Sequence, residues 1–97
     1  MTRVEVLPDA LRQIERASSW WRKHRLRAPE LFSHELAAAF KVLEEQPESG
    51  RMFPRPRFPE LRVLLMPRTR YHLYYDIVGE DVRVLSVWSA VRGRGQL

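Results

Sequence analysis

The stretch that decides the fold is RYHLYYDIVGEDVRVLSVWS, residues 70–89. Its first half is dense in tyrosine and alternates apolar and polar side chains around His72, which is typical of a β-strand. Its second half is rich in valine and carries apolar residues on both faces near Trp88. Between them, residues 78–81 (VGED) have the composition of a hairpin turn. We therefore expect an antiparallel pair of strands over 70–78 and 82–89.

Two more strands are expected upstream of this hairpin. Residues 61–66 (LRVLLM) form a mostly apolar run that Pro67 closes, and residues 3–7 (RVEVL) alternate and are rich in valine. Residues 51–59 hold three of the seven prolines and three arginines, so we predict an extended loop there.

Two helices are expected between the first strand and that loop. Pro8 and Asp9 signal a helix start, and residues at helical spacing mark one face of a helix ending near Lys23: Leu11, Ile14, Ser18 and Trp21. Pro29 suits the first position of a second helix, which ends near Gln46 and has the apolar stripe Phe32, Leu36, Ala39 and Leu43. The prediction is a single α+β domain over residues 1–97, ordered β-α-α-β-β-β, with a helical hairpin packed on an antiparallel-rich twisted sheet.

The positive charge is confined to the second half of the chain. Residues 1–50 carry eight Lys/Arg and eight Asp/Glu, whereas residues 51–97 carry nine arginines, no lysine and four acids, which accounts for the net charge of +5. A GC-rich coding sequence would explain the excess of arginine over lysine but not this asymmetry. Because a guanidinium group binds carboxylate or phosphate in a bidentate manner, we expect the second half to meet a negatively charged partner.

Several classes of function are disfavoured. The chain has no cysteine, its three histidines (His24, His34 and His72) form no i, i+4 pair, and its glycines lack the spacing of a phosphate-binding loop. There is no run of eighteen apolar residues and no apolar stretch near the start. We expect a cytoplasmic protein that needs no metal or cofactor and does not enter a membrane.

One group of polar side chains in the predicted sheet has the chemistry for metal-free RNA cleavage: Arg62, Arg68, Arg70, His72 and Arg92. Arginines can neutralise a phosphodiester in its transition state, and a histidine can move a proton near neutral pH. Structural roles are the alternative. His72 would then be a hydrogen-bonded strand residue, and Arg62 would form an internal ion pair with a helix carboxylate.

Other aromatic and basic residues could likewise have either a role in binding nucleic acid or a structural role. Tyr71, Tyr74, Tyr75 and Trp88 could stack on bases or belong to the core and rim of the sheet. The basic stretch over residues 22–27 could contact nucleic acid, or it could complement the dipole at the end of the first helix and turn the chain.

The order and spacing of these segments resemble the RelE/ParE superfamily, the toxins of type II toxin–antitoxin pairs. The resemblance rests on residues 61–64, 71–76 and 82–88, on Arg92, and on the helix that ends in LEEQP (43–47) before Gly50. It implies a compact toxin neutralised by an acidic, partly disordered antitoxin that is encoded next to it. The toxin would then form a homodimer or a hetero-oligomer with the antitoxin. RelE-like members cut mRNA on the ribosome without metal, while ParE-like members inhibit DNA gyrase and have no known nuclease activity.

Departures from the RelE-like pattern favour the ParE-like branch. This chain has His72 where RelE-like toxins carry arginine, no histidine near Ser89, and neither tyrosine nor histidine over residues 89–97. The expected function is therefore gyrase inhibition through an anion-binding set: Arg62, Arg68, Arg70, Arg83, Arg92 and Arg94. The alternative is a RelE-like endoribonuclease that uses Arg62, His72 and Arg92. A second alternative is a basic binding module with no toxic role.

Overall fold

A long hairpin forms the centre of the sheet in the computed structural model, which describes residues 2–92. Strands β4 (Tyr71–Val78) and β5 (Asp81–Ser89) pair antiparallel, and Gly79 has φ of 63° in the two-residue turn that joins them. Glycine has no Cβ, so it adopts this left-handed conformation without strain. The predicted hairpin is confirmed, although β5 begins at Asp81, one residue before the predicted position.

The remaining strands extend this hairpin on both sides in the order β1-β5-β4-β3-β2. Strand β1 (Val4–Val6) pairs parallel with β5, whereas β3 (Arg62–Met66) and β2 (Arg51–Met52) continue the sheet antiparallel. The predicted extended loop over 51–59 is therefore wrong at its first two residues. The prolines begin only at Pro54, so nothing prevents Arg51 and Met52 from donating to a ladder beside β3.

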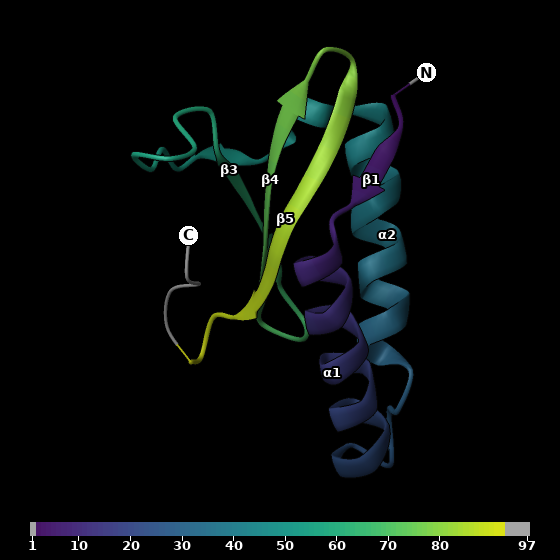
Figure 1. Ribbon diagram of the computed structural model, residues 1–97. Helices are drawn as coiled ribbons and strands as arrows, with labels where there is room; N and C mark the ends of the chain where they lie inside the picture. Colours follow the sequence, from purple (N-terminus) through teal and green to yellow (C-terminus); the bar gives the residue numbers. More distant parts are fainter. Residues whose placement is uncertain (1, 93–97) are drawn as a thin grey trace.

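Two antiparallel helices, α1 (Pro8–His24) and α2 (Leu31–Glu45), cover one face of the sheet (Figure 1). The predicted stripe of α2 is buried, but Leu11 of the predicted α1 face is 50% exposed. The second helix begins at Leu31 and not at Pro29, because Pro29 lies in the turn that reverses the chain between the helices. The α+β fold class is as predicted, with one more strand and a short 3-10 helix, η1 (Pro47–Ser49).

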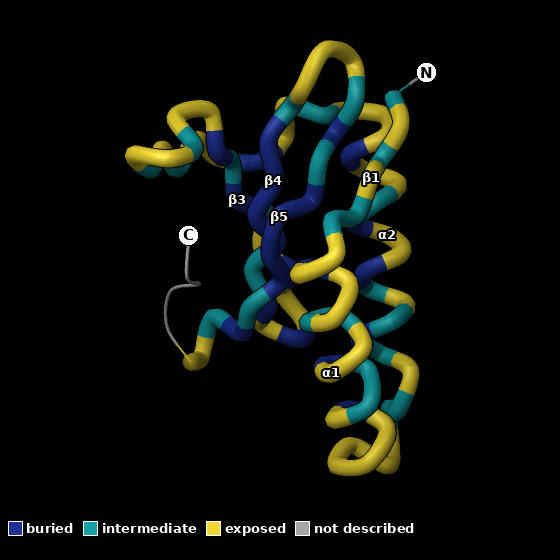
Figure 2. The backbone as a smooth tube through the Cα atoms, viewed as in Figure 1, coloured by how far each residue is buried: buried dark blue, intermediate teal, exposed yellow. Residues whose placement is uncertain are grey.

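The two faces of β4 carry different side chains. Tyr71, Leu73 and Tyr75 face the helices and join the main core, in which the rings of Phe32 and Tyr71 lie edge to face at 4.9 Å. The opposite face bears a second apolar cluster: Leu61, Val63, Tyr74 and Leu85. Both central strands are therefore mostly buried, while the far end of the helical hairpin is mostly exposed (Figure 2).

A bulge explains why β5 does not alternate strictly. Tyr74 pairs with Ser86 and Tyr75 with Val84, so Leu85 is an extra residue on its strand. Val84 faces the helices, Leu85 faces away, and Val87 faces the helices again. This shift produces the apolar side chains on both faces of the sheet near Trp88.

The phenol of Tyr75 fastens the end of the helical hairpin to the sheet. Its hydroxyl accepts a hydrogen bond from Gly50 N (2.7 Å) and donates one to Pro47 O (2.8 Å). A Cβ atom at position 50 would lie 2.4 Å from this hydroxyl, so the close approach requires glycine.

The turn between β3 and β4 is fastened to α2 by Glu35. Its carboxylate accepts hydrogen bonds from the backbone N–H groups of Arg68 and Thr69 (both 2.8 Å) and from the Thr69 hydroxyl (2.7 Å). Burial alone would raise the pKa of Glu35, but these hydrogen bonds and the charge of Arg68 outweigh it and lower the pKa below its ordinary value of 4.5.

Replacing Tyr75 with phenylalanine should destabilise the fold, because Gly50 N–H and Pro47 C=O would lose their shared partner. We expect Tyr75→Phe to lower the free energy of unfolding in urea by about 1–3 kcal/mol. The matched control is Tyr71→Phe, since no hydrogen bond engages the Tyr71 hydroxyl in the described part of the chain. An equal loss in both variants would contradict the proposed role of the Tyr75 hydroxyl.

Glu35→Gln should reduce stability at neutral pH, because the amide NH₂ group cannot accept the second backbone hydrogen bond. We expect a loss of about 1.5–3 kcal/mol at pH 7 in urea unfolding. A lowered folded pKa contributes stability above the unfolded pKa that is lost as pH falls through the folded pKa. The difference from the wild type should therefore shrink below about pH 4. Glu44→Gln, on the exposed side of the same helix, is the control, and a pH-independent difference would refute the explanation.

Candidate functional site

Arg62 lies on the side of the sheet that faces the helices. It pairs across β3 and β4 with Tyr75, and its strand neighbours Leu64 and Met66 belong to the core on that side. Its guanidinium group donates to the backbone oxygens of Glu48 (3.0 Å) and Gly50 (2.9 Å). The internal ion pair considered from the sequence is therefore wrong: Arg62 is satisfied by carbonyl groups and not by a helix carboxylate.

His72 lies on the opposite face of the sheet. It is opposite Trp88 of the neighbouring strand β5 in the sheet register, and its Nδ1 is 3.5 Å from the hydroxyl of Tyr74. Burial, followed by the charges of Arg51 and Arg70, lowers the pKa of His72 below 6.5, so its ring is mainly neutral at pH 7. A neutral imidazole can accept a proton, but the sheet separates it from Arg62. The structure does not bring these two predicted catalytic residues together.

The other predicted arginines differ in what they contact. Arg83 forms a bidentate ion pair with Asp76 on the neighbouring strand (3.0 and 2.7 Å), and this hydrogen bonding raises the pKa of Arg83. Arg68 and Arg70 lie exposed in the β3–β4 turn, where Arg70 has φ of 65°. Arg92 lies over the Trp88 ring at 4.9 Å. Arg94 is outside the described residues.

The tyrosines serve the core and not a stacking surface. Tyr74 is 2% exposed and Tyr75 is fully buried, and Tyr71 packs against α2, so the structural alternative is correct for all three. Trp88 is different, because it lies beside a pocket.

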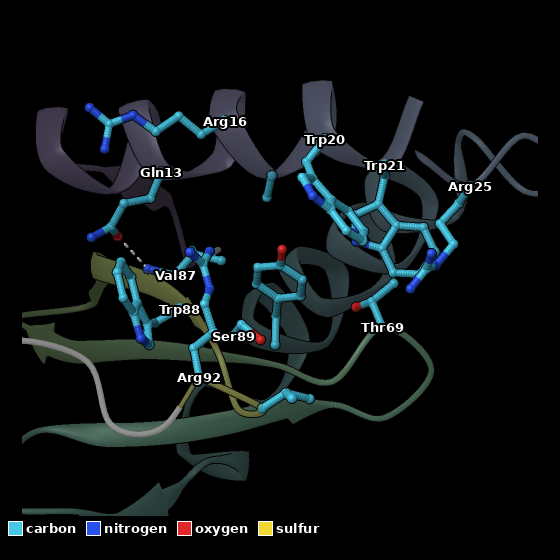
Figure 3. A pocket seen from close by; sticks show the side chains of 13 residues that line it. Gln13, Arg16, Trp20, Trp21, Arg25, Thr69, Val87, Trp88, Ser89 and Arg92 are labelled. Carbon is cyan, nitrogen blue, oxygen red and sulfur yellow. Dashed lines mark hydrogen bonds between the residues drawn. The ribbon is translucent and has the colours of Figure 1, made fainter. Parts of the chain in front are cut away.

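This pocket of about 530 Å³ lies between α1, the end of β5 and the β3–β4 turn (Figure 3). We call it the tryptophan pocket, since Trp20, Trp21 and Trp88 all line it. Gln13 lies at one end of it and binds the edge of β5: its Oε1 accepts hydrogen bonds from Val87 N (2.7 Å) and the Ser86 hydroxyl (3.1 Å).

Three arginines also line the tryptophan pocket: Arg16, Arg25 and Arg92. Arg92 belongs to the anion-binding set predicted from the sequence, and Arg25 lies in the basic stretch over residues 22–27, whereas Arg16 was not predicted. The helical spacing of residues 13, 16, 17, 20 and 21 was visible in the sequence as one stripe of α1, but the sequence does not show that the end of β5 faces this stripe.

Within residues 2–92, no group of three or more His, Asp or Glu side chains is placed to hold a metal ion. None of the described helices has the length and apolar character needed to cross a membrane.

Residues 4–93 match the family described as the ParE toxin of the type II toxin-antitoxin system, parDE. No relative was found among curated protein sequences. Among solved structures, the fold is similar to a chain described as the chromosomal ParDE TA system from P. aeruginosa. Its TM-score is 0.70 at 16% identity, over 92% of this chain and 96% of that one. At this identity the likeness shows the fold alone. Because the family match spans nearly the whole chain, the protein belongs to the ParE toxin family of type II toxin–antitoxin systems.

Proposed function

We propose that this toxin inhibits bacterial growth by binding DNA gyrase and not by cutting RNA. The observation that carries the proposal is the separation of Arg62 and His72 on opposite faces of the sheet. A metal-free ribonuclease that uses the predicted pair would need Arg62 and His72 around one phosphate, within hydrogen-bond reach of the reacting atoms. Here the Arg62 guanidinium group holds two backbone carbonyls, so it is engaged in maintaining the fold.

The arginines available for a target are those whose guanidinium groups have no hydrogen-bond or ion-pair partner. No hydrogen bond or ion pair engages the guanidinium groups of Arg68, Arg70 and Arg92 within residues 2–92, whereas Arg62 and Arg83 are already occupied. Arg68 and Arg70 project from one short turn that Glu35 fixes to α2. A rigid support reduces the entropy lost on binding, so this turn is the best-placed contact for an acidic surface of gyrase.

An acidic antitoxin fits the same distribution of charge. A partly disordered segment that folds on binding could lay carboxylates against Arg68, Arg70 and Arg92, and it would form a hetero-oligomer with the toxin. Such charge pairing speeds association and is weakened by salt. Family membership supports a cognate antitoxin, and a short acidic reading frame beside the gene would support it further.

Gyrase inhibition can be measured directly with purified protein. We expect the wild type to block DNA supercoiling by gyrase in vitro and to leave cellular mRNA intact when it is expressed without antitoxin. For the same inhibition of supercoiling, we expect at least roughly tenfold more of the double variant Arg68→Gln/Arg70→Gln than of the wild type. This factor corresponds to about 1.4 kcal/mol of binding free energy. The matched control is Arg12→Gln/Arg57→Gln, which removes two exposed arginines elsewhere.

Three outcomes would overturn the proposal. Unimpaired supercoiling at toxin concentrations well above that of gyrase would exclude gyrase as the target. Cleaved mRNA after induction, lost in His72→Ala while the purified variant keeps its fold, would establish the ribonuclease alternative. Harmless expression of the wild type in a host without antitoxin would favour a basic binding module.

A further inference from the structure

The tryptophan pocket combines flat rings with positive charge. Guanidinium groups already stack on its indoles: Arg25 lies 4.8 Å from the Trp20 ring and 5.6 Å from the Trp21 ring, and Arg92 lies 4.9 Å from Trp88. No carboxylate lines the pocket among the described residues. Its volume of about 530 Å³ lies within the range of 300–1,000 Å³ typical of ligand sites.

Two buried donors of the pocket lack acceptors. The indole N–H groups of Trp21 and Trp88 are inaccessible to solvent and have no hydrogen-bond partner among residues 2–92. Buried polar groups are normally paired, because an unpaired one loses its hydration without compensation.

The positive surface continues beyond the pocket along the end of α1. Residues 22–27 include four Lys/Arg and one histidine but no acid, and His24 stacks on Trp20 with ring centroids 4.8 Å apart. Trp20 is 41% exposed even with His24 and Arg25 against its ring. The basic stretch thus runs directly into the pocket through Arg25.

We propose that the tryptophan pocket binds single-stranded nucleic acid, with a base among the indoles and the flanking phosphates on Arg16, Arg25 and Arg92. Aromatic rings beside a basic strip are the features by which proteins bind single strands without sequence preference. An acidic protein segment would also meet the charge. Such a segment offers nothing to stack on the rings, whereas a base can replace the guanidinium groups on the indole faces while these groups pair with the flanking phosphates. Nucleic acid satisfies the stacking and the charge together, and the proposal does not depend on gyrase being the target.

Tryptophan fluorescence of the full chain comes from the pocket, because all three tryptophans line it. We expect saturable quenching of tryptophan fluorescence by a single-stranded oligothymidylate of about ten nucleotides, within the usual site size of 4–16. Contacts from about three arginines to phosphate predict a slope near −2 for log K against log salt concentration. Poly-glutamate and inorganic phosphate serve as the probes of charge without a base.

Two variants test the assignment. Arg16→Gln/Arg92→Gln should weaken oligonucleotide binding at least tenfold and make the salt slope shallower by roughly 1.4. Arg12→Gln/Arg57→Gln, with the same change in net charge, should bind like the wild type. Absence of saturable quenching, or equal loss in both variants, would overturn the proposal. Stronger binding of poly-glutamate would assign the pocket to an acidic protein partner instead. Supercoiling assays on the same proteins keep this question separate from gyrase inhibition.

Discussion

Strand β4 lies at the centre of the sheet, and the alternation of its side chains constrains what every other element can contact. Tyr71, Leu73 and Tyr75 must point towards the helices, so the rings fill the core and the Tyr75 hydroxyl reaches the segment after α2. His72 must then point away from the helices. Arg62 is aligned with Tyr75 in the register, and it is therefore placed on the face that His72 cannot reach. A single periodicity thus stabilises the fold and separates two groups that catalysis would need together.

Much of this arrangement could be predicted from the sequence because periodic patterns report local structure. The stripe of α2, the β4–β5 hairpin and the order of the motifs identified the fold class and the family. Features that depend on tertiary pairing could not be predicted. Strand β2 exists only because the chain after η1 pairs with β3, and the bulge at Leu85 changes the phase of β5 without any marker in its composition. The predicted start of the second helix at Pro29 was wrong for a related reason, since proline suits both the first position of a helix and the turn before a helix.

The arginine excess shows what a charge count can and cannot reveal. It correctly located the positive half of the chain, but it could not separate arginines that hold the fold from those that face outward. Arg62 and Arg83 are bound to groups of this same chain, to carbonyl oxygens in one case and to Asp76 in the other. Arg16 and Arg25 belong to the half with no net charge, and yet they line the tryptophan pocket together with Arg92. Local surroundings, and not overall composition, decide where charge is available.

The contact of Gln13 with Val87 has a consequence for the order of folding. These residues are 74 positions apart, and β1 likewise pairs with residues 82–84 of β5. During synthesis the first strand and the start of α1 cannot acquire these partners until residues 82–87 have left the ribosome. Closing such distant contacts is slow compared with forming the helices. The tryptophan pocket therefore forms only after β5 has been synthesised, and a nascent chain that lacks β5 cannot present it.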